Sequence, residues 1–526
     1  MESKPKEKSD LARSAGIVSM ATLISRLLGL VREQVTAYLF GASDAVDAFK
    51  SAFRIPNLLR DMFAEGALSA GFIPIFSEKL RSGSREDAIR FAGLVFGALT
   101  AIVAVVVLLM MMLTPQLVSL IAEGFEQVPG KLDSTVSLAR LMMPFLLMVS
   151  LAALLMGILN SLGKFFIPAL APALMNIGMI LCAIALTPFV DPPVLSLAIG
   201  VLVGGAAQFL VQYLALRKAG FRFPLIVDFA NPDLLRLILL ILPTAVGLAA
   251  TQINVAVVNR IASTDSGAVS YLDYAFRLLH LPLGLFAIAI ATVALPRLSA
   301  EAASGNVQQF GQIHSSALRL GLFLSLPATM LMVLLAEPIC AAVYQYGAFT
   351  SENSLQTAKA LAMYSVGLPF FTLVRITVPA FYAMKDTKTP AIISLMSVLA
   401  NVLMCFELRD YFGFSGLALA ASLAGIVNFG LLTYLLRKRI KIAEDAGVLM
   451  AFARIGGATL LTGAVVWLVR EYVVAQFIAD RVHHIFELLI QVAIAIITLI
   501  LSCWLFRVEE LTQLKNAIKG RFLRSR

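Results

Sequence analysis

Long apolar runs separated by short polar stretches recur along the whole chain. A helix needs ~20 mostly apolar residues to cross the hydrocarbon core of a membrane. Fourteen stretches reach about that length: 11–40, 46–78, 88–116, 134–160, 165–188, 194–218, 233–262, 267–297, 310–345, 355–384, 388–408, 414–438, 449–471 and 482–507. The pattern therefore predicts an all-α polytopic membrane protein with 14 transmembrane helices.

The first two spans are the least hydrophobic, because they carry charges far from their ends. Residues three, four or seven apart share one face of a helix. In the second span such a stripe holds Asp47, Lys50, Arg54, Asn57, Asp61 and Glu65, with Arg60 at its edge. In the first span it holds Ser19, Thr22, Arg26, Gly29 and Glu33, and in the eighth Asp273, Arg277, His280 and Gly284. A charge at bilayer depth costs at least ~2.5 kcal/mol, so these stripes indicate a watered interior or a pathway.

Arg32 lies about 120° from the stripe of the first span on a straight helix. Two alternatives stay open: a bend at Gly29 turns it inward, or it lies near enough to an end to snorkel. Pro56 similarly offers a bend that redirects Arg60.

The basic residues of these stripes outnumber the acids at similar depth. Arg26, Arg60 and Arg277 have no equal set of carboxylates. Surplus buried cations need an anionic partner, and guanidinium groups suit bidentate contact with phosphate. The alternative is internal ion pairing, Arg26 with Glu33 or Arg54 with Asp61, which fixes helix packing and binds nothing. For the cluster as a whole the surplus favours an anionic ligand.

Composition agrees with a membrane protein. The 526 residues are 59% hydrophobic and 14% charged, against ~25% charged in average soluble domains, and the mean hydropathy is +0.88. The net charge of +10 is better explained by loops that face anionic lipid than by nucleic acid. The four cysteines lie singly in apolar runs, so we expect neither a disulfide framework nor a metal site or other cofactor: Cys182, Cys340, Cys405 and Cys503.

Basic residues gather in alternate loops. One set holds Lys79, Arg81, Arg85 and Arg90, then Lys164, then Arg217, Lys218 and Arg222, then Lys385 and Lys388, then Arg437, Lys438, Arg439 and Lys441. The other loops are short or acidic, and in Glu123–Asp133 only Lys131 is basic. The positive-inside rule therefore predicts that both termini are cytoplasmic.

The chain also repeats itself at a period of about 220 residues. Ala52-Phe53-Arg54 matches Ala275-Phe276-Arg277, Pro144-Phe145 matches Pro369-Phe370, and Leu216-Arg217-Lys218 matches Leu436-Arg437-Lys438. Six spans per repeat predict two pseudo-symmetric six-helix lobes around a central cavity, with the ligand site at their interface. We expect lobes at 1–220 and 221–442, two extra C-terminal helices in 443–507, and a basic cytoplasmic tail at 508–526.

The polar motifs resemble those of the MurJ (MviN) lipid II flippases, within the multidrug/oligosaccharidyl-lipid/polysaccharide exporter superfamily. The likeness rests on Ser25-Arg26-Leu-Leu-Gly29 with Arg32, Asp47-Ala-Phe, Pro56-Asn57-Leu-Leu-Arg60 and Phe63-Ala-Glu65-Gly66-Ala, and it covers essentially the whole chain. It implies a bacterial inner-membrane protein with a V-shaped cavity between two lobes. It also implies alternating access that moves undecaprenyl-pyrophosphate-linked disaccharide-pentapeptide to the outer leaflet for peptidoglycan synthesis.

By position, the resemblance assigns essential cavity arginines to Arg26, Arg32, Arg60 and Arg277, and further motif residues to Asp47, Asn57 and Glu65. With Arg54 from the polar stripe, these are the candidate substrate-binding residues. The last two spans resemble a pair that forms a groove for the lipid tail. The chain departs from some relatives at Phe276, where they have an acid. Asn401 is followed by Cys405 rather than an acid, so the sequence does not predict a sodium site there.

We therefore expect a monomeric lipid II flippase, not an enzyme. A flippase for another polyprenyl-linked oligosaccharide remains an alternative. A drug or cation antiporter of the same superfamily predicts a cavity dominated by acids, which the arginine surplus disfavours. An intramembrane glycosyltransferase needs a general base or a metal-binding carboxylate cluster in a long loop, and the sequence contains no such loop.

Overall fold

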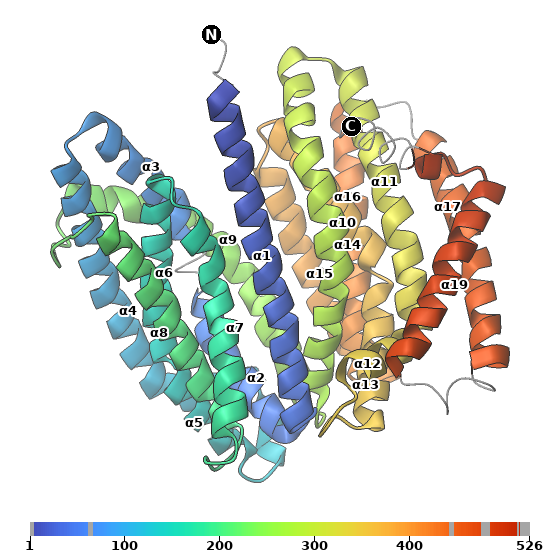
Figure 1. Ribbon diagram of the computed structural model, residues 1–526, viewed down its shortest axis with the longest axis horizontal. Coiled ribbons are helices and arrows are strands. Elements are labelled where there is room, and N and C mark those ends of the chain that lie inside the picture. Colours follow the sequence, from blue (N-terminus) through green and yellow to red (C-terminus); the bar gives the residue numbers. More distant parts are fainter. Residues whose placement is uncertain (1–4, 61–66, 441–445, 475–483, 513–514, 516–526) are drawn as a thin grey trace. The chain divides into compact units, whose positions relative to one another are not determined.

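The structure is a computed structural model that describes residues 5–60, 67–440, 446–474, 484–512 and 515. Within these ranges every regular element is a helix (Figure 1). The all-α architecture predicted from the apolar runs is therefore confirmed.

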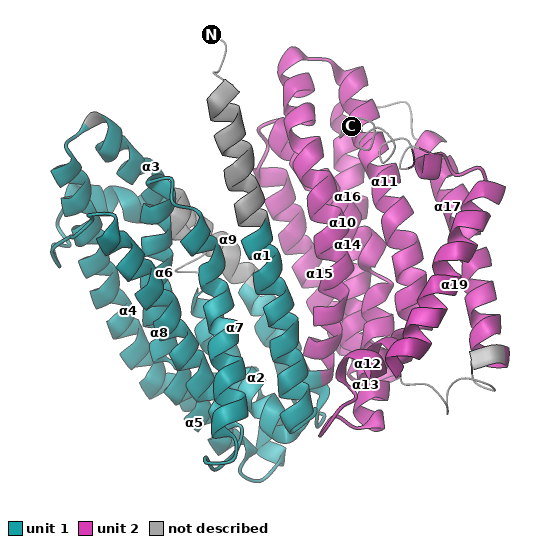
Figure 2. Cartoon of the chain, in the orientation of Figure 1, with its two compact units in different colours: residues 1–270 teal, residues 271–526 magenta. Residues whose placement is uncertain are grey.

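The chain divides into two compact units, with the boundary between Ser270 and Tyr271 (Figure 2). The first unit contains α1 (Pro5–Phe40), α2 (Asp44–Arg60), α3 (Ala67–Ser82), α4 (Arg85–Ile121), the short η2 (Glu123–Gln127), α5 (Lys131–Met142), α6 (Pro144–Ser161), α7 (Phe166–Leu186), α8 (Leu195–Lys218), α9 (Pro232–Ala262) and the first residues of α10 (Ala268–Ser304).

The second unit contains the rest of α10 and the helices that follow it. These are α11 (Val307–Leu334), α12 (Ala336–Tyr344), α13 (Ser351–Ser365), α14 (Leu368–Ala383), α15 (Lys388–Phe412), α16 (Ser415–Ile440), α17 (Ala446–Val469), the π-helical turn η3 (Arg470–Val474) and α19 (His484–Leu505).

Ten helices of the described ranges are long and apolar enough to cross a membrane, or eleven if α13 and α14, bent by 43°, form one span. The three other expected spans coincide with α1, with α2 followed by α3, and with α9. The polar stripe makes α1 less apolar than the other spans, whereas α2 and α3, with 17 and 16 residues, are each shorter than a membrane span. The total of fourteen stays a prediction.

The internal repeat is visible in the backbone. A helix ends just before Pro144 and another near Pro369, since proline lacks the N–H that would continue the preceding helix. Both following helices end in the same turn: Gly163 has φ 73°, and Lys385, 222 residues later, has φ 60°. After the first, Lys164 N donates to Leu159 O (2.9 Å), and after the second, Asp386 N donates to Phe381 O (3.0 Å). Gly220 and Gly305 make the same turn after α8 and α10, so it is a common helix end, which Lys385 adopts although a lysine rarely takes positive φ.

Small residues let α7 and α8 pack closely in the first unit. A Cβ on Gly204 would lie 2.7 Å from the Cα of Met175, which only glycine avoids. The opposite side of α7 packs against α1 (Figure 1). A Cβ on Gly29 would come 3.7 Å from Asn176 Nδ2, so this part of the polar stripe of α1 lies beside α7.

Candidate functional site

Asp47 is fully buried, with 0% of its surface exposed. Its carboxylate accepts hydrogen bonds from the backbone N–H (2.9 Å) and hydroxyl (2.6 Å) of Ser270 and from the N–H of Gly267 (2.8 Å). Lys131 Nζ lies 3.2 Å from Asp47 Oδ2 and 2.6 Å from Asp44 Oδ1. Both oxygens of Asp47 are thus engaged within the protein, which joins α2 and α5 to the first turn of α10.

Lys131 is a residue that the sequence reasoning did not select. It is buried at the start of α5, and its ammonium group lies 4.1 Å from the centre of the Phe125 ring. One feature of the sequence could have indicated a role for Lys131: it is the only basic residue of the otherwise acidic loop Glu123–Asp133. A buried lysine needs a partner, and the nearby acids are Asp44 and Asp47.

Arg32 lies against α7. Its guanidinium pairs with Glu33, donates to Asn176 Oδ1 (3.1 Å) and contacts the sulfur of Met179 (3.8 Å). Only 12% of its side chain is exposed, so Arg32 does not snorkel to an interface. Asn176 also donates to the carbonyl of Ser25 (3.1 Å), so its side chain forms hydrogen bonds between α7 and α1.

Glu33 is shared between two cations. Its Oε1 pairs with Arg32, and its Oε2 lies 3.7 Å from Lys50 Nζ on α2. The side chains of Glu33 and Lys50 are only 5% and 8% exposed. One carboxylate thus lies between the two cations Arg32 and Lys50. The alternative pairing of Arg26 with Glu33 is not found.

Arg26 and Arg54 have no such partners. Arg26 is exposed and Arg54 is half-buried. Neither makes a hydrogen bond or an ion pair with another residue in the described part of the chain. Within the described part of the chain, no residue therefore occupies the guanidinium group of either arginine.

The structure describes only two of the remaining candidate residues of the second span, Asn57 and Arg60. Asn57 is half-buried, and its Oδ1 accepts no hydrogen bond from the residues that the structure describes. Arg60 is half-buried at the last position of α2. Asp61 and Glu65 lie outside the described residues, so the pairing of Arg54 with Asp61 is untested.

In the second unit, Arg277 is half-buried on α10. The neighbouring Phe276 is exposed, and its ring centre lies 4.2 Å from that of His280 and 5.4 Å from that of Tyr364. His280 Nδ1 lies 3.0 Å from the carbonyl oxygen of Phe276. Within the described ranges, no group of three or more His, Cys, Asp and Glu side chains is arranged to hold a metal ion.

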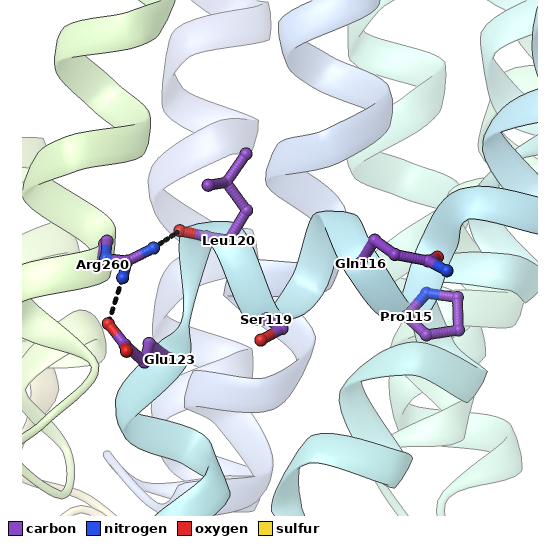
Figure 3. A pocket seen from close by; sticks show the side chains of 6 residues that line it. All are labelled: Pro115, Gln116, Ser119, Leu120, Glu123 and Arg260. Atoms are coloured by element: carbon purple, nitrogen blue, oxygen red, sulfur yellow. Dashed lines mark hydrogen bonds and ion pairs between the residues drawn. The ribbon is translucent and has the colours of Figure 1, made fainter.

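A separate pocket of about 480 Å³ lies at the end of α4 (Figure 3). It is lined by Pro115, Gln116, Ser119, Leu120, Glu123 and Arg260. Arg260 donates to the carbonyl of Leu120 (3.0 Å) and pairs with Glu123. The one basic and the one acidic residue that line this pocket, Arg260 and Glu123, form an ion pair. The pocket therefore has no surplus of basic residues among its lining side chains, unlike the polar stripes of α1 and α2.

The chain matches known proteins over most of its length. The family model described as "Lipid II flippase MurJ" matches residues 36–502. The probable lipid II flippase MurJ of Rickettsia prowazekii is 36% identical over 462 residues, which cover 88% of this chain and 91% of that protein. The lipid II flippase MurJ of Burkholderia cenocepacia is 33% identical over 465 residues, which cover 87% and 90%.

Solved structures give the same result. A lipid II flippase MurJ in an inward closed conformation is 30% identical and has a TM-score of 0.79, covering 93% of this chain and 98% of that one. An inward-facing multidrug resistance transporter of the MATE family in the MOP superfamily has a TM-score of 0.69 at 15% identity, covering 81% and 98%. The second match shows a shared fold alone.

Proposed function

The chain belongs to the MurJ family of lipid II flippases, and we propose that it moves lipid II from the cytoplasmic to the periplasmic leaflet of the bacterial inner membrane. Transport proceeds by alternating access and supplies peptidoglycan synthesis. A multi-pass membrane protein with polar stripes on α1 and α2 suits such a cargo, whose headgroup is polar and whose tail is a hydrocarbon.

The observation that carries this proposal is the pair of guanidinium groups on Arg26 and Arg54 without partners among the described residues. The nearby Glu33 is occupied by Arg32 and Lys50. Asp47 is occupied by Lys131 and the start of α10. A pyrophosphate group supplies the negative charge that these arginines lack, through charge-assisted hydrogen bonds.

Each candidate residue has a role in this proposal. Arg26 and Arg54 contact the pyrophosphate directly, as do Arg60 and Arg277 in our proposal, and Asn57 offers its amide to the headgroup. Arg32 is held in place by Glu33 and Asn176 and contributes positive charge. Asp47 positions the first turn of α10 and does not contact cargo. Glu65 keeps the binding role that the motif implies.

The need to release the cargo limits the affinity of the site for the headgroup. Water on the periplasmic side must be able to replace the arginine contacts, so the site binds the headgroup strongly enough to load and weakly enough to unload. Positive charges in the cavity also respond to the membrane potential.

The remaining expectations are part of the same proposal. The repeats form lobes 1–220 and 221–442, residues 443–507 hold the lipid tail, and residues 508–526 are a cytoplasmic tail. Both termini are cytoplasmic, and the protein acts as a monomer, without nucleic acid and without enzymatic chemistry. Incubation of the purified protein with labelled lipid-linked sugar yields no new product if this proposal is right.

The test is a leaflet-resolved lipid II assay in cells depleted of their own flippase. Arg26→Ala and Arg54→Ala each remove one charge-assisted contact of ~1.5–3 kcal/mol, so flipping falls roughly 10- to 100-fold. Arg217→Ala, at the exposed end of α8, is the matched control and flips normally. Equal abundance in the membrane shows that all three variants fold. Normal flipping by both cavity variants contradicts the proposal.

A further inference from the structure

The linker between α8 and α9 lies directly on α4. A Cβ on Gly93 would come 2.2 Å from the carbonyl oxygen of Pro224, and a Cβ on Gly97 would come 2.0 Å from that of Ile226. Ile226 N donates to Gly93 O (3.4 Å). Two glycines one turn apart thus leave room for an extended segment that no side chain at these positions would allow.

Side chains also hold the first part of the same linker. Phe221 is buried in the core formed by α3, α4 and α6, and Phe223 packs on Phe96 with ring centres 5.1 Å apart. Arg85 Nη2 donates to the carbonyls of Ala219 and Gly220, both at 3.3 Å. We call residues 219–231 the strap.

The beginning of α9 is fixed to the same unit. Leu234 and Leu237 are buried in the core that contains Phe221. Asp233 forms an ion pair with Lys79 on α3 at 2.7 Å. The first turns of α9 therefore pack with the first unit rather than following a free loop.

The end of α9 is fixed there as well. Asn259 is 1% exposed and donates to the carbonyl of Ile121 (2.7 Å) and to the hydroxyl of Ser51 (3.2 Å). The hydroxyl of Ser263 accepts from the N–H of Gly124 at 3.0 Å. Asp44 and Asp47 then hold Ser266, Gly267 and Ser270.

We infer that α9 moves as part of the first unit, and that the joint between the two units lies in α10 directly after Ser270 rather than in the linker after α8. The inference rests on the proposed function, since the movement in question is the one that transports cargo. The sequence repeat places its boundary at residue 220, one whole span earlier. In this inference α9, which is the first span of the second sequence repeat, therefore moves with the first unit, to which the strap attaches it.

This location has a consequence for Arg277. It lies seven residues after Ser270 on the same helix, about 10 Å along the axis at ~1.5 Å per residue. Arg277 therefore lies in α10 beyond the joint, whereas Arg26 and Arg54 lie on α1 and α2 of the first unit.

The test locks α9 to the first unit at both ends. In a background with Cys182, Cys340, Cys405 and Cys503 replaced by alanine, one variant carries Lys79→Cys with Asp233→Cys, and the other Ser51→Cys with Asn259→Cys. A short bis-methanethiosulfonate reagent bridges each pair in membrane vesicles, and a reductant removes the bridge. Gel mobility after proteolysis gives the bridged fraction, and the leaflet-resolved lipid II assay gives transport.

Bridged protein is expected to flip lipid II within twofold of the reduced protein. A loss of tenfold or more that the reductant reverses overturns the inference, because it shows that α9 must leave the first unit. Hydrogen exchange of the purified full chain gives a readout that needs no lipid II. The amides of Phe221 and Ile226, which donate to Leu216 and Gly93, exchange as slowly as the facing part of α4, and free-loop exchange overturns the inference. Failure of the unmodified chain to flip lipid II contradicts the proposed function and leaves the exchange result to decide the inference.

Discussion

Asp47 and Ser270 are hydrogen-bonded to each other and occupy equivalent positions of the two sequence repeats. They lie 223 residues apart, the same separation as Ala52-Phe53-Arg54 and Ala275-Phe276-Arg277. Two aspartates at this contact would repel each other. Instead, one repeat supplies a carboxylate and the other supplies an N–H and a hydroxyl, so the halves differ in residue type where their equivalent positions meet.

Replacement of Asp47 by asparagine tests this contact. The amide keeps the shape but loses the charge, and its NH₂ group opposes the donors of Ser270 or Gly267. Breaking a buried ion pair typically costs about 3–5 kcal/mol, so the variant should unfold at a clearly lower temperature in detergent. Asp133→Asn, an exposed acid in the first turn of α5, is the control and unfolds like the parent. Equal unfolding temperatures of the two variants would show that the contacts of Asp47 do not stabilise the fold.

The sharing of Glu33 by Arg32 and Lys50 predicts energetic coupling. Glu33→Gln leaves two buried cations close together, whereas Lys50→Met in the same background removes one of them. The double variant should therefore be more stable than the sum of the single effects, with a coupling energy on the order of 1–3 kcal/mol. Thermal unfolding of the parent, both single variants and the double variant measures it. Additive effects would mean that Lys50 and Glu33 do not interact.

Gly93→Ala tests the strap. The new methyl group would lie 2.2 Å from the carbonyl oxygen of Pro224, which is a backbone atom, so the strap must shift. Overpacking of this kind typically costs about 1–3 kcal/mol, and exchange of the Ile226 amide, which donates to Gly93 O, should accelerate. Gly456→Ala on α17 meets nothing within 4 Å and serves as control. Its stability should rise slightly, since alanine favours a helix more than glycine. Unchanged exchange in Gly93→Ala would argue against a docked strap.

Asp386, in the loop between α14 and α15, gives a pH-dependent contribution to stability. Hydrogen bonds from Thr389, with Arg439 close by, hold the pKa of this carboxyl below its usual value. A carboxyl with a lowered folded-state pKa stabilises the protein above its unfolded pKa of ~3.9. This stabilisation is lost as the pH falls through the lower folded pKa. The difference in unfolding temperature between the parent and Asp386→Asn should thus be largest above pH ~5 and shrink toward pH ~3. A difference independent of pH would contradict this assignment.

The sequence by itself determined the helices and their polar faces. Apolar length predicts spans, but it did not predict that the spans at 134–160, 310–345 and 355–384 each consist of two helices. Helical periodicity placed Asp47, Lys50 and Arg54 on one side of α2, because that relationship is local to one element. The family followed from the spacing of the same residues within α1 and α2.

Only the tertiary structure decided which polar residues neutralise each other and which stay available. Asp47 meets Lys131, 84 residues away, and Asn259 meets Ser51, 208 residues away. Periodicity along one helix contains no information on such partners, because they depend on how separate helices pack. For the same reason the sequence does not distinguish Gly93 and Gly97 from other glycines in helices. Their role follows from the strap, whose backbone packs against them. The surplus of arginine was visible in the sequence, but only the packing shows that Glu33 and Asp47 are occupied by other residues and that Arg26 and Arg54 have no partner among the described residues.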